Sequence, residues 1–187
     1  MSKKLIIDWD TYNKSIDNLA VQISDSGFKP SFIICIARGG LRVGDILSRI
    51  FNVKCGYLGV ESYSAEKNNQ IADKQNELTF ARDLSTTSRS YGENILVTDD
   101  LIDTGVTLEK TLKWLENYKD FKDKKINLKS AVLYKKEKSN FKSDYIVHNL
   151  QDNPWIVFPY ELRELVSIED LRTVSYTHLT LPTTCCV

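Results

Sequence analysis

The chain has 187 residues, a length that suits one domain built from a sheet with helices on both faces. Its 25 basic and 25 acidic side chains cancel, which argues against a nucleic-acid partner or an anionic membrane surface. We therefore expect neither partner, and any site for an anion must be local.

The four cysteines show neither zinc-binding nor disulfide spacing. Cys35 and Cys55 lie in apolar runs, and Cys185 and Cys186 are adjacent. This usage favours a reducing, cytoplasmic setting. The first four residues lead into only a short apolar run, and no stretch reaches membrane-spanning length, so we expect neither a signal peptide nor an anchor.

The first predicted elements are a helix and a strand. After Asp10, apolar residues recur at helical spacing and predict an amphipathic helix that ends before Gly27 and Pro30. Residues 32–37 then form a continuous apolar run, typical of a buried strand. The inward stripe of the helix consists of Tyr12, Ile16, Leu19 and Ile23.

A short loop, Arg38-Gly39-Gly40, follows this strand and precedes a second apolar, helical stretch. Two glycines let backbone amides approach a ligand, and the Arg38 guanidinium matches the oxygens of a phosphate. On its own, however, the motif is more typical of a plain turn between strand and helix.

Residues 54–60 predict another short strand, and residues 61–89 are polar and without apolar periodicity. Loops of this length are usually lids or disordered segments. The segment is therefore either a lid over a reacting centre or an insert without a role.

The most informative stretch is residues 94–108. An apolar run ends at Asp99 and Asp100, turns through residues 103–107 and enters a helical pattern. The turn lies at a helix N-terminus, where free amides and the helix dipole favour an anion. Two carboxylates beside such a cradle need a cation or a polyhydroxy ligand, and a sugar phosphate with Mg²⁺ satisfies both requirements. The alternative is an ordinary turn in which Asp103 caps the helix.

Residues 97–107, Val-Thr-Asp-Asp-Leu-Ile-Asp-Thr-Gly-Val-Thr, resemble the phosphoribosyl pyrophosphate (PRPP) motif of type I phosphoribosyltransferases. Thr98 stands where many relatives carry an acidic or apolar residue. The resemblance implies an α/β fold with a central parallel sheet flanked by helices, a flexible hood loop and a small C-terminal base-binding segment. It also implies Mg²⁺ as cofactor and a homo-oligomer, a dimer or a tetramer.

The resemblance assigns roles to the residues of the two loops. Asp99 and Asp100 hold ribose hydroxyls and the metal, the metal through water or through those hydroxyls, and Asp103 is the general base toward the purine N7 proton. Arg38, Gly39 and Gly40 bind pyrophosphate, in a loop where relatives often have a non-proline cis peptide, which we predict at Ala37–Arg38. Residues 61–89 correspond to the hood. The PRPP-binding residues are Asp99, Asp100, Asp103, Thr104, Gly105, Val106 and Thr107.

Further strands follow at residues 128–134 and 144–148, after a lysine-rich connection that we interpret as solvated. Strands alternating with helices indicate a parallel α/β sheet with its ligand at the carboxyl ends of the strands. Lys135, like the Arg38 loop and the PRPP motif, falls at such an end.

Residues 153–161 contain two prolines around a short extended run that starts with Trp155, a reasonable wall for a flat ring. The segment resembles the purine-binding segment, about residues 150–165, of microbial xanthine, guanine and hypoxanthine phosphoribosyltransferases. This implies that Trp155 stacks on the purine, the Ile156 backbone reads its 2-position and Lys135 donates to the 6-oxo group. The alternatives are a core tryptophan and a solvated strand-end lysine.

The sequence thus predicts a purine-salvage enzyme that transfers the phosphoribosyl group of PRPP to hypoxanthine, guanine or xanthine. The alternatives are a PRPP- or nucleotide-sensing regulator of the same fold and a phosphoribosyltransferase for another base. We assign no role to His148 or His178. Residues 174–187 abandon the helical pattern of residues 167–172 and resemble a vector-derived tail, so we place the domain at residues 1–173.

Overall fold

A computed structural model describes residues 3–62 and 78–172. Contacts divide the chain into two compact units, one from residues 1–12 and 154–187 and one from residues 13–153. The sequence-based limits of the domain stay a prediction. None of the helices within the two described ranges is both long and apolar enough to cross a membrane.

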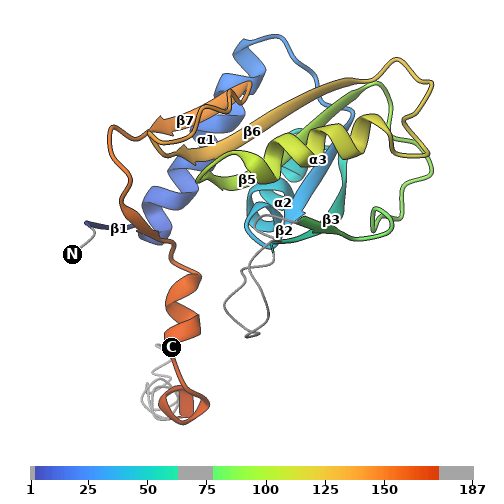
Figure 1. The fold of residues 1–187 in the computed structure, drawn as a ribbon. Helices are drawn as coiled ribbons and strands as arrows, with labels where there is room; N and C mark the ends of the chain where they lie inside the picture. The colour runs from blue at the N-terminus through green and yellow to red at the C-terminus, as the bar shows by residue number, and fades with distance from the viewer. Residues whose placement is uncertain (1–2, 63–77, 173–187) are drawn as a thin grey trace, which may run out of the picture. The chain divides into compact units, whose positions relative to one another are not determined.

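The larger unit is built on a sheet with the strand order β4-β3-β2-β5-β6-β7 (Figure 1). Four of its strand pairs are parallel, and only β4 runs antiparallel to its neighbour β3. This arrangement confirms the predicted parallel α/β class. The strands are β2 (Phe32–Ala37), β3 (Lys54–Ser62), β4 (Leu78–Phe80), β5 (Asn94–Ile102), β6 (Asn127–Lys135) and β7 (Tyr145–Asn149).

Strand β5 is longer than its apolar run predicts. It continues past Val97 through Asp99 and Asp100 to Ile102, because it stays paired with β6 as far as Ile102 and Lys135. The two carboxylates therefore sit on a strand held by backbone hydrogen bonds, which fixes their directions better than a loop could.

Three helices pack with the sheet: α1 (Trp9–Asp25), α2 (Gly40–Ile50) and α3 (Val106–Glu116). The predicted inward stripe of α1 is confirmed, since its four residues are fully buried. Ile34 and Val97 join the core cluster that contains Leu108 and Leu115 of α3. Figure 1 shows α3 in front of β5 and β6.

Helix α2 lies against the side of the sheet that carries Cys35 and Thr98. A Cβ atom added at Gly44 would overlap the Cys35 sulfur, so α2 can come this close only with a glycine at that position. Thr98 is fully buried, and its hydroxyl oxygen lies 3.4 Å from the carbonyl oxygens of Ile34 and Gly40. The unusual threonine of the PRPP motif is therefore part of the contact between α2 and the sheet.

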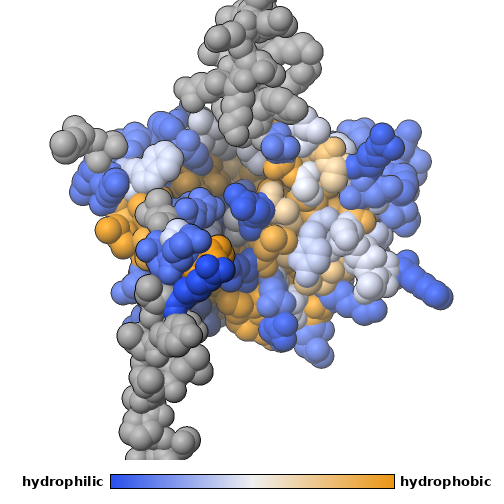
Figure 2. Space-filling view, turned by 90° about the horizontal axis from the view of Figure 1, so that it is seen from below, coloured by the Kyte–Doolittle hydropathy of each residue, from blue (hydrophilic) through white to orange (hydrophobic). Residues whose placement is uncertain are grey.

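The smaller unit contains the parallel strand pair β1 (Lys4–Ile6) and β8 (Trp155–Val157), followed by the 3₁₀ helix η2 (Glu161–Leu165). Tyr12, Phe158 and Tyr160 form an aromatic cluster with ring centroids 5.5 to 5.9 Å apart. Ser167 and Asp170 bond reciprocally and so cap the start of the helix over residues 168–172. Figure 2 views the molecule from below, relative to Figure 1, and its surface shows hydrophobic patches among hydrophilic residues.

Candidate active site

The loop between β5 and α3, residues 103–105, has the geometry of an anion-binding site and is called the anion cradle below. Gly105 precedes the helix with φ of +91°, in the left-handed region, and an added Cβ would overlap the Cβ of Phe141. Only glycine fits this turn without strain. Thr104 is exposed, and its hydroxyl accepts a hydrogen bond of 3.4 Å from the Val106 amide. The first amides of α3 thus point into the loop, where the helix dipole favours an anion.

The cradle is supported from behind by the segment after β6. The Ser139 hydroxyl donates to the Thr104 carbonyl oxygen at 2.9 Å, and the Phe141 amide donates to the Ser139 hydroxyl at 3.3 Å. The sequence analysis missed both residues. No local signal marks them, because they lie in a polar turn far along the chain from the loop that they hold.

The Arg38 loop meets the PRPP motif directly. The peptide bond between Ala37 and Arg38 is cis, as predicted. A Cβ atom at Gly39 would overlap the Asp100 carboxylate, and one at Gly40 would overlap the Thr98 carbonyl oxygen. The paired glycines therefore allow the two loops to converge at the carboxyl ends of β2 and β5.

Asp99 and Asp100 are neighbouring acids whose negative charges repel each other. Asp99 accepts a hydrogen bond of 3.0 Å from the Asp100 amide. Desolvation, followed by the neighbouring charge of Asp100, raises the pKa of Asp99 well above its ordinary value. A bound cation or a hydroxyl donor would relieve this repulsion.

These carboxylates suit a magnesium ion that takes its remaining ligands from a substrate. Within residues 3–62 and 78–172, no group of three or more acidic, histidine or cysteine side chains is arranged to hold a metal by itself. Mg²⁺ usually binds through one or two carboxylates together with substrate phosphates and water. Asp99 and Asp100 match that requirement.

Asp103 is held by two lysines. Its Oδ1 lies 2.7 Å from Lys136 Nζ and 3.0 Å from Lys138 Nζ, which also lies 3.1 Å from Oδ2. Partial burial acts to raise the pKa of Asp103, but the hydrogen bonds and charges of the two lysines outweigh it and lower that pKa. Asp103 is therefore ionised at neutral pH.

The helix-cap alternative for Asp103 does not agree with this geometry. Gly105, not Asp103, occupies the position before α3, and the first amide of the helix, that of Val106, donates to the Thr104 hydroxyl. The sequence analysis also missed Lys136 and Lys138. Their only signal was the run of lysines that follows β6.

The predicted base-binding residues lie in different parts of the chain. Lys135 is half-buried at the end of β6, paired in register with Ile102 of β5. Trp155 is 61% exposed, which argues against a core tryptophan, and Ile156 is buried. Both belong to the smaller unit, and their contact with a purine stays a prediction.

The phosphoribosyl transferase domain family matches residues 8–165 of the chain. The chain belongs to this family and is therefore a transferase. It is 27% identical to the xanthine-guanine phosphoribosyltransferase of Idiomarina loihiensis, over 86% of this chain and 89% of that protein.

Two solved structures are similar to the chain. The xanthine-guanine-hypoxanthine phosphoribosyltransferase of Helicobacter pylori is similar with a TM-score of 0.68 and 25% identity, covering 87% of this chain and 97% of that one. The purine phosphoribosyltransferase of Pyrococcus horikoshii shares the fold with a TM-score of 0.66 and 24% identity, covering 84% and 93% of the two chains.

Proposed function

We propose that this enzyme transfers the phosphoribosyl group of PRPP to a 6-oxopurine, releasing pyrophosphate and a nucleoside monophosphate for purine salvage. The observation that carries the proposal is the convergence of the Arg38 loop with Asp100 beside the anion cradle at Thr104. The names of the relatives from Idiomarina and Helicobacter support hypoxanthine, guanine or xanthine as the base.

In this proposal PRPP is held at both ends. The amides of residues 104–107 and the hydroxyls of Thr104 and Thr107 bind the 5′-phosphate. Asp99 and Asp100 accept from the ribose hydroxyls and would hold Mg²⁺, whose chemistry is to neutralise charge on the leaving pyrophosphate. Arg38 and the amides of Gly39 and Gly40 bind that pyrophosphate.

The reaction breaks the bond between the anomeric carbon and the pyrophosphate oxygen and forms a bond to the purine nitrogen. Positive charge develops on the sugar, as in glycoside transfer. The purine loses its N7 proton, which Asp103 accepts on a carboxylate oxygen. General-base catalysis of this kind contributes roughly 10²- to 10⁴-fold in rate.

Base recognition completes the proposal. Lys135 donates to the 6-oxo group, Trp155 stacks on the ring and the Ile156 backbone contacts the 2-position. The hood, about residues 61–89, closes over the centre and excludes water. Its described part includes β4, while residues 63–77, like the tail at 174–187, lie outside the described residues. We further propose that the enzyme acts as a dimer or a tetramer.

A pyrophosphate-release assay with PRPP, Mg²⁺ and a panel of bases tests the proposal. We expect release with hypoxanthine, guanine or xanthine and little with orotate, uracil or adenine. Release only with a pyrimidine would indicate a phosphoribosyltransferase for another base. No release, together with salt-sensitive binding of nucleic acid, would favour the regulator instead.

A further inference from the structure

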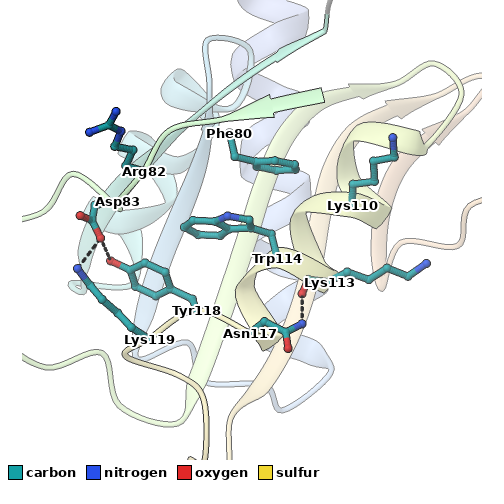
Figure 3. Close-up of a pocket in the computed structure, with 9 residues that line it drawn as sticks. All are labelled: Phe80, Arg82, Asp83, Lys110, Lys113, Trp114, Asn117, Tyr118 and Lys119. Carbon is teal, nitrogen blue, oxygen red and sulfur yellow. Dashed lines mark hydrogen bonds and ion pairs between the residues drawn. The ribbon is translucent and has the colours of Figure 1, made fainter. Parts of the chain in front are cut away.

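A cavity lies beside α3, and three of its lining residues, Phe80, Arg82 and Asp83, belong to the segment proposed as the hood. It has a volume of about 570 Å³ and is lined by the end of β4 and the residues after it, by the last turns of α3 and by residues 117–119. None of residues 38–40 or 99–107 lines it. Figure 3 shows its side chains, all of which belong to the larger unit.

The inner wall of the cavity is aromatic. Trp114 lies between Phe80 and Tyr118 (Figure 3), with ring centroids 5.9 Å and 4.8 Å away and interplanar angles of 9° and 27°. At 5.9 Å, nearly parallel rings are laterally displaced, so Phe80 covers only part of the indole face. Phe80 and Trp114 are both half-buried. The wall therefore offers flat aromatic surface to a planar ligand.

The rim of the cavity is positively charged. Four basic side chains and one acidic side chain line it, although the whole chain has a formal net charge of zero. Arg82 and Lys119 lie on one side of the rings, and Lys110 and Lys113 lie on the other (Figure 3). The lining thus concentrates positive charge around an aromatic surface.

Two acids near this rim, Asp83 and Glu109, already have partners, and the charge of a third, Glu116, also acts on Lys113. Asp83 pairs with Lys119 and accepts a hydrogen bond of 3.2 Å from the Tyr118 hydroxyl, which leaves its charge compensated. Glu109 lies 2.7 Å from Lys113, but both side chains are more than half exposed, at 52% and 66%. Exposed pairs of this kind are weak, so Lys113 can turn to a phosphate at small cost.

We propose that this cavity binds a free nucleoside polyphosphate, with its base against the parts of the Phe80 and Trp114 rings that remain exposed and its phosphates at Lys110 and Lys113. The aromatic wall favours a nucleotide over an inorganic polyphosphate. The volume lies within the range of roughly 300 to 1,000 Å³ that is usual for small-ligand sites. The balanced charge of the whole chain argues against a nucleic-acid track, which needs an extended basic surface. The proposal does not depend on the reaction assigned to the active site.

Calorimetric titration of the whole chain with ATP and with GTP tests the proposal. We expect saturable binding, with tryptophan fluorescence quenched in parallel. The double variant Lys110→Gln/Lys113→Gln should bind ATP at least tenfold more weakly. The matched control Lys14→Gln/Lys122→Gln removes two exposed lysines outside the cavity and should bind like the wild type.

Two further variants separate the parts of the site. Trp114→Leu keeps an apolar side chain but removes the ring, so it should weaken ATP binding and leave the affinity for inorganic triphosphate unchanged. Thr104→Ala/Thr107→Ala alters the proposed phosphate cradle of the active site and should not change ATP affinity. Thermal unfolding of each variant shows whether it is folded.

Five results would overturn the proposal. The first is no binding of ATP or GTP at millimolar concentration, and the second is equal ATP affinity of the Lys110/Lys113 variant and the wild type. The third is that the wild type binds inorganic triphosphate as tightly as ATP. The fourth is that it binds a single-stranded oligonucleotide more tightly than either nucleotide. Loss of ATP binding in the Thr104/Thr107 variant would also overturn it, by assigning the nucleotide to the active site.

Discussion

The ammonium nitrogen of Lys136 lies 2.7 Å from Oδ1 of Asp103. The Lys136 side chain is only 10% exposed, so its charge is shielded from water and interacts strongly with the carboxylate. Lys138 approaches the same carboxylate from solvent, with its side chain 44% exposed. Together the two lysines fix the direction of Asp103 and keep it ionised, the state that a general base requires.

Replacement of Asp103 tests its proposed role in proton transfer. Asp103→Asn keeps the shape but cannot accept the purine proton, so kcat should fall by roughly 10²- to 10⁴-fold while the Kd for PRPP changes little. Steady-state kinetics and calorimetric binding of PRPP measure the two effects. Asp25→Asn, an exposed change on α1, is the control. Equal losses in kcat and PRPP affinity would indicate a structural role.

The lysine pair predicts a pH dependence. Because the pKa of Asp103 is lowered, its ionised form contributes stability that is fully present above the ordinary carboxylate pKa of about 3.9 and is lost as pH falls through the lower folded value. Lys138→Gln raises the pKa of Asp103 toward that ordinary value, so the acidic limb of kcat/KM should move to higher pH. The pH profile of kcat/KM measures this shift.

Lys142→Gln provides the matched control for that profile, because Lys142 is an exposed lysine on the same segment that makes no ion pair with Asp103. The acidic limb of the kcat/KM profile of Lys142→Gln should coincide with that of the wild type. If the Lys138→Gln profile also coincides, Asp103 does not set the acidic limb.

The left-handed turn at Gly105 predicts a loss of stability on substitution. In Gly105→Ala the new Cβ meets Phe141 at a positive φ, which should cost about 1–2 kcal/mol in the free energy of unfolding and weaken PRPP binding. Urea denaturation measures the first effect. Gly59→Ala is the comparison, because an added Cβ there makes only an ordinary contact of 3.5 Å with Ala81. Equal stability of the two variants would contradict the strained turn.

The contact between Gly39 and Asp100 predicts a change in substrate binding. Gly39→Ala places a methyl group where the Asp100 carboxylate lies, so the Arg38 loop must shift. We expect the KM for PRPP to rise at least tenfold, with a smaller change in the KM for the base. Initial rates at varied PRPP and varied base separate the two constants. A larger change for the base would show that this loop does not contact PRPP.

The fold was predictable because its signals are local. A buried parallel strand such as residues 32–37 reads as a continuous apolar run, and the PRPP motif combines a strand end, a glycine turn and a helix start within a few residues. The cis peptide at Ala37–Arg38 was predictable only through the family resemblance.

The support of Asp103 was not predictable, because it depends on strand register. Lys135 and Lys136 are neighbours whose side chains point in different directions at a strand end, and a shift of one residue would exchange them. The hydrogen bond of 3.0 Å from the Lys136 amide to the Ile102 carbonyl, together with the β5–β6 pairing, selects Lys136 for Asp103. Ser139 and Phe141 reach the loop between β5 and α3 in the same non-local way.

Direct detection of the nucleotide product tests the central claim most sharply. Chromatography of wild-type reactions with PRPP, Mg²⁺ and each 6-oxopurine should reveal the corresponding nucleoside 5′-monophosphate, formed in equal amount with pyrophosphate and strongly reduced in Asp103→Asn. Absence of a nucleoside monophosphate with all three bases, from folded protein that binds PRPP, would contradict the account.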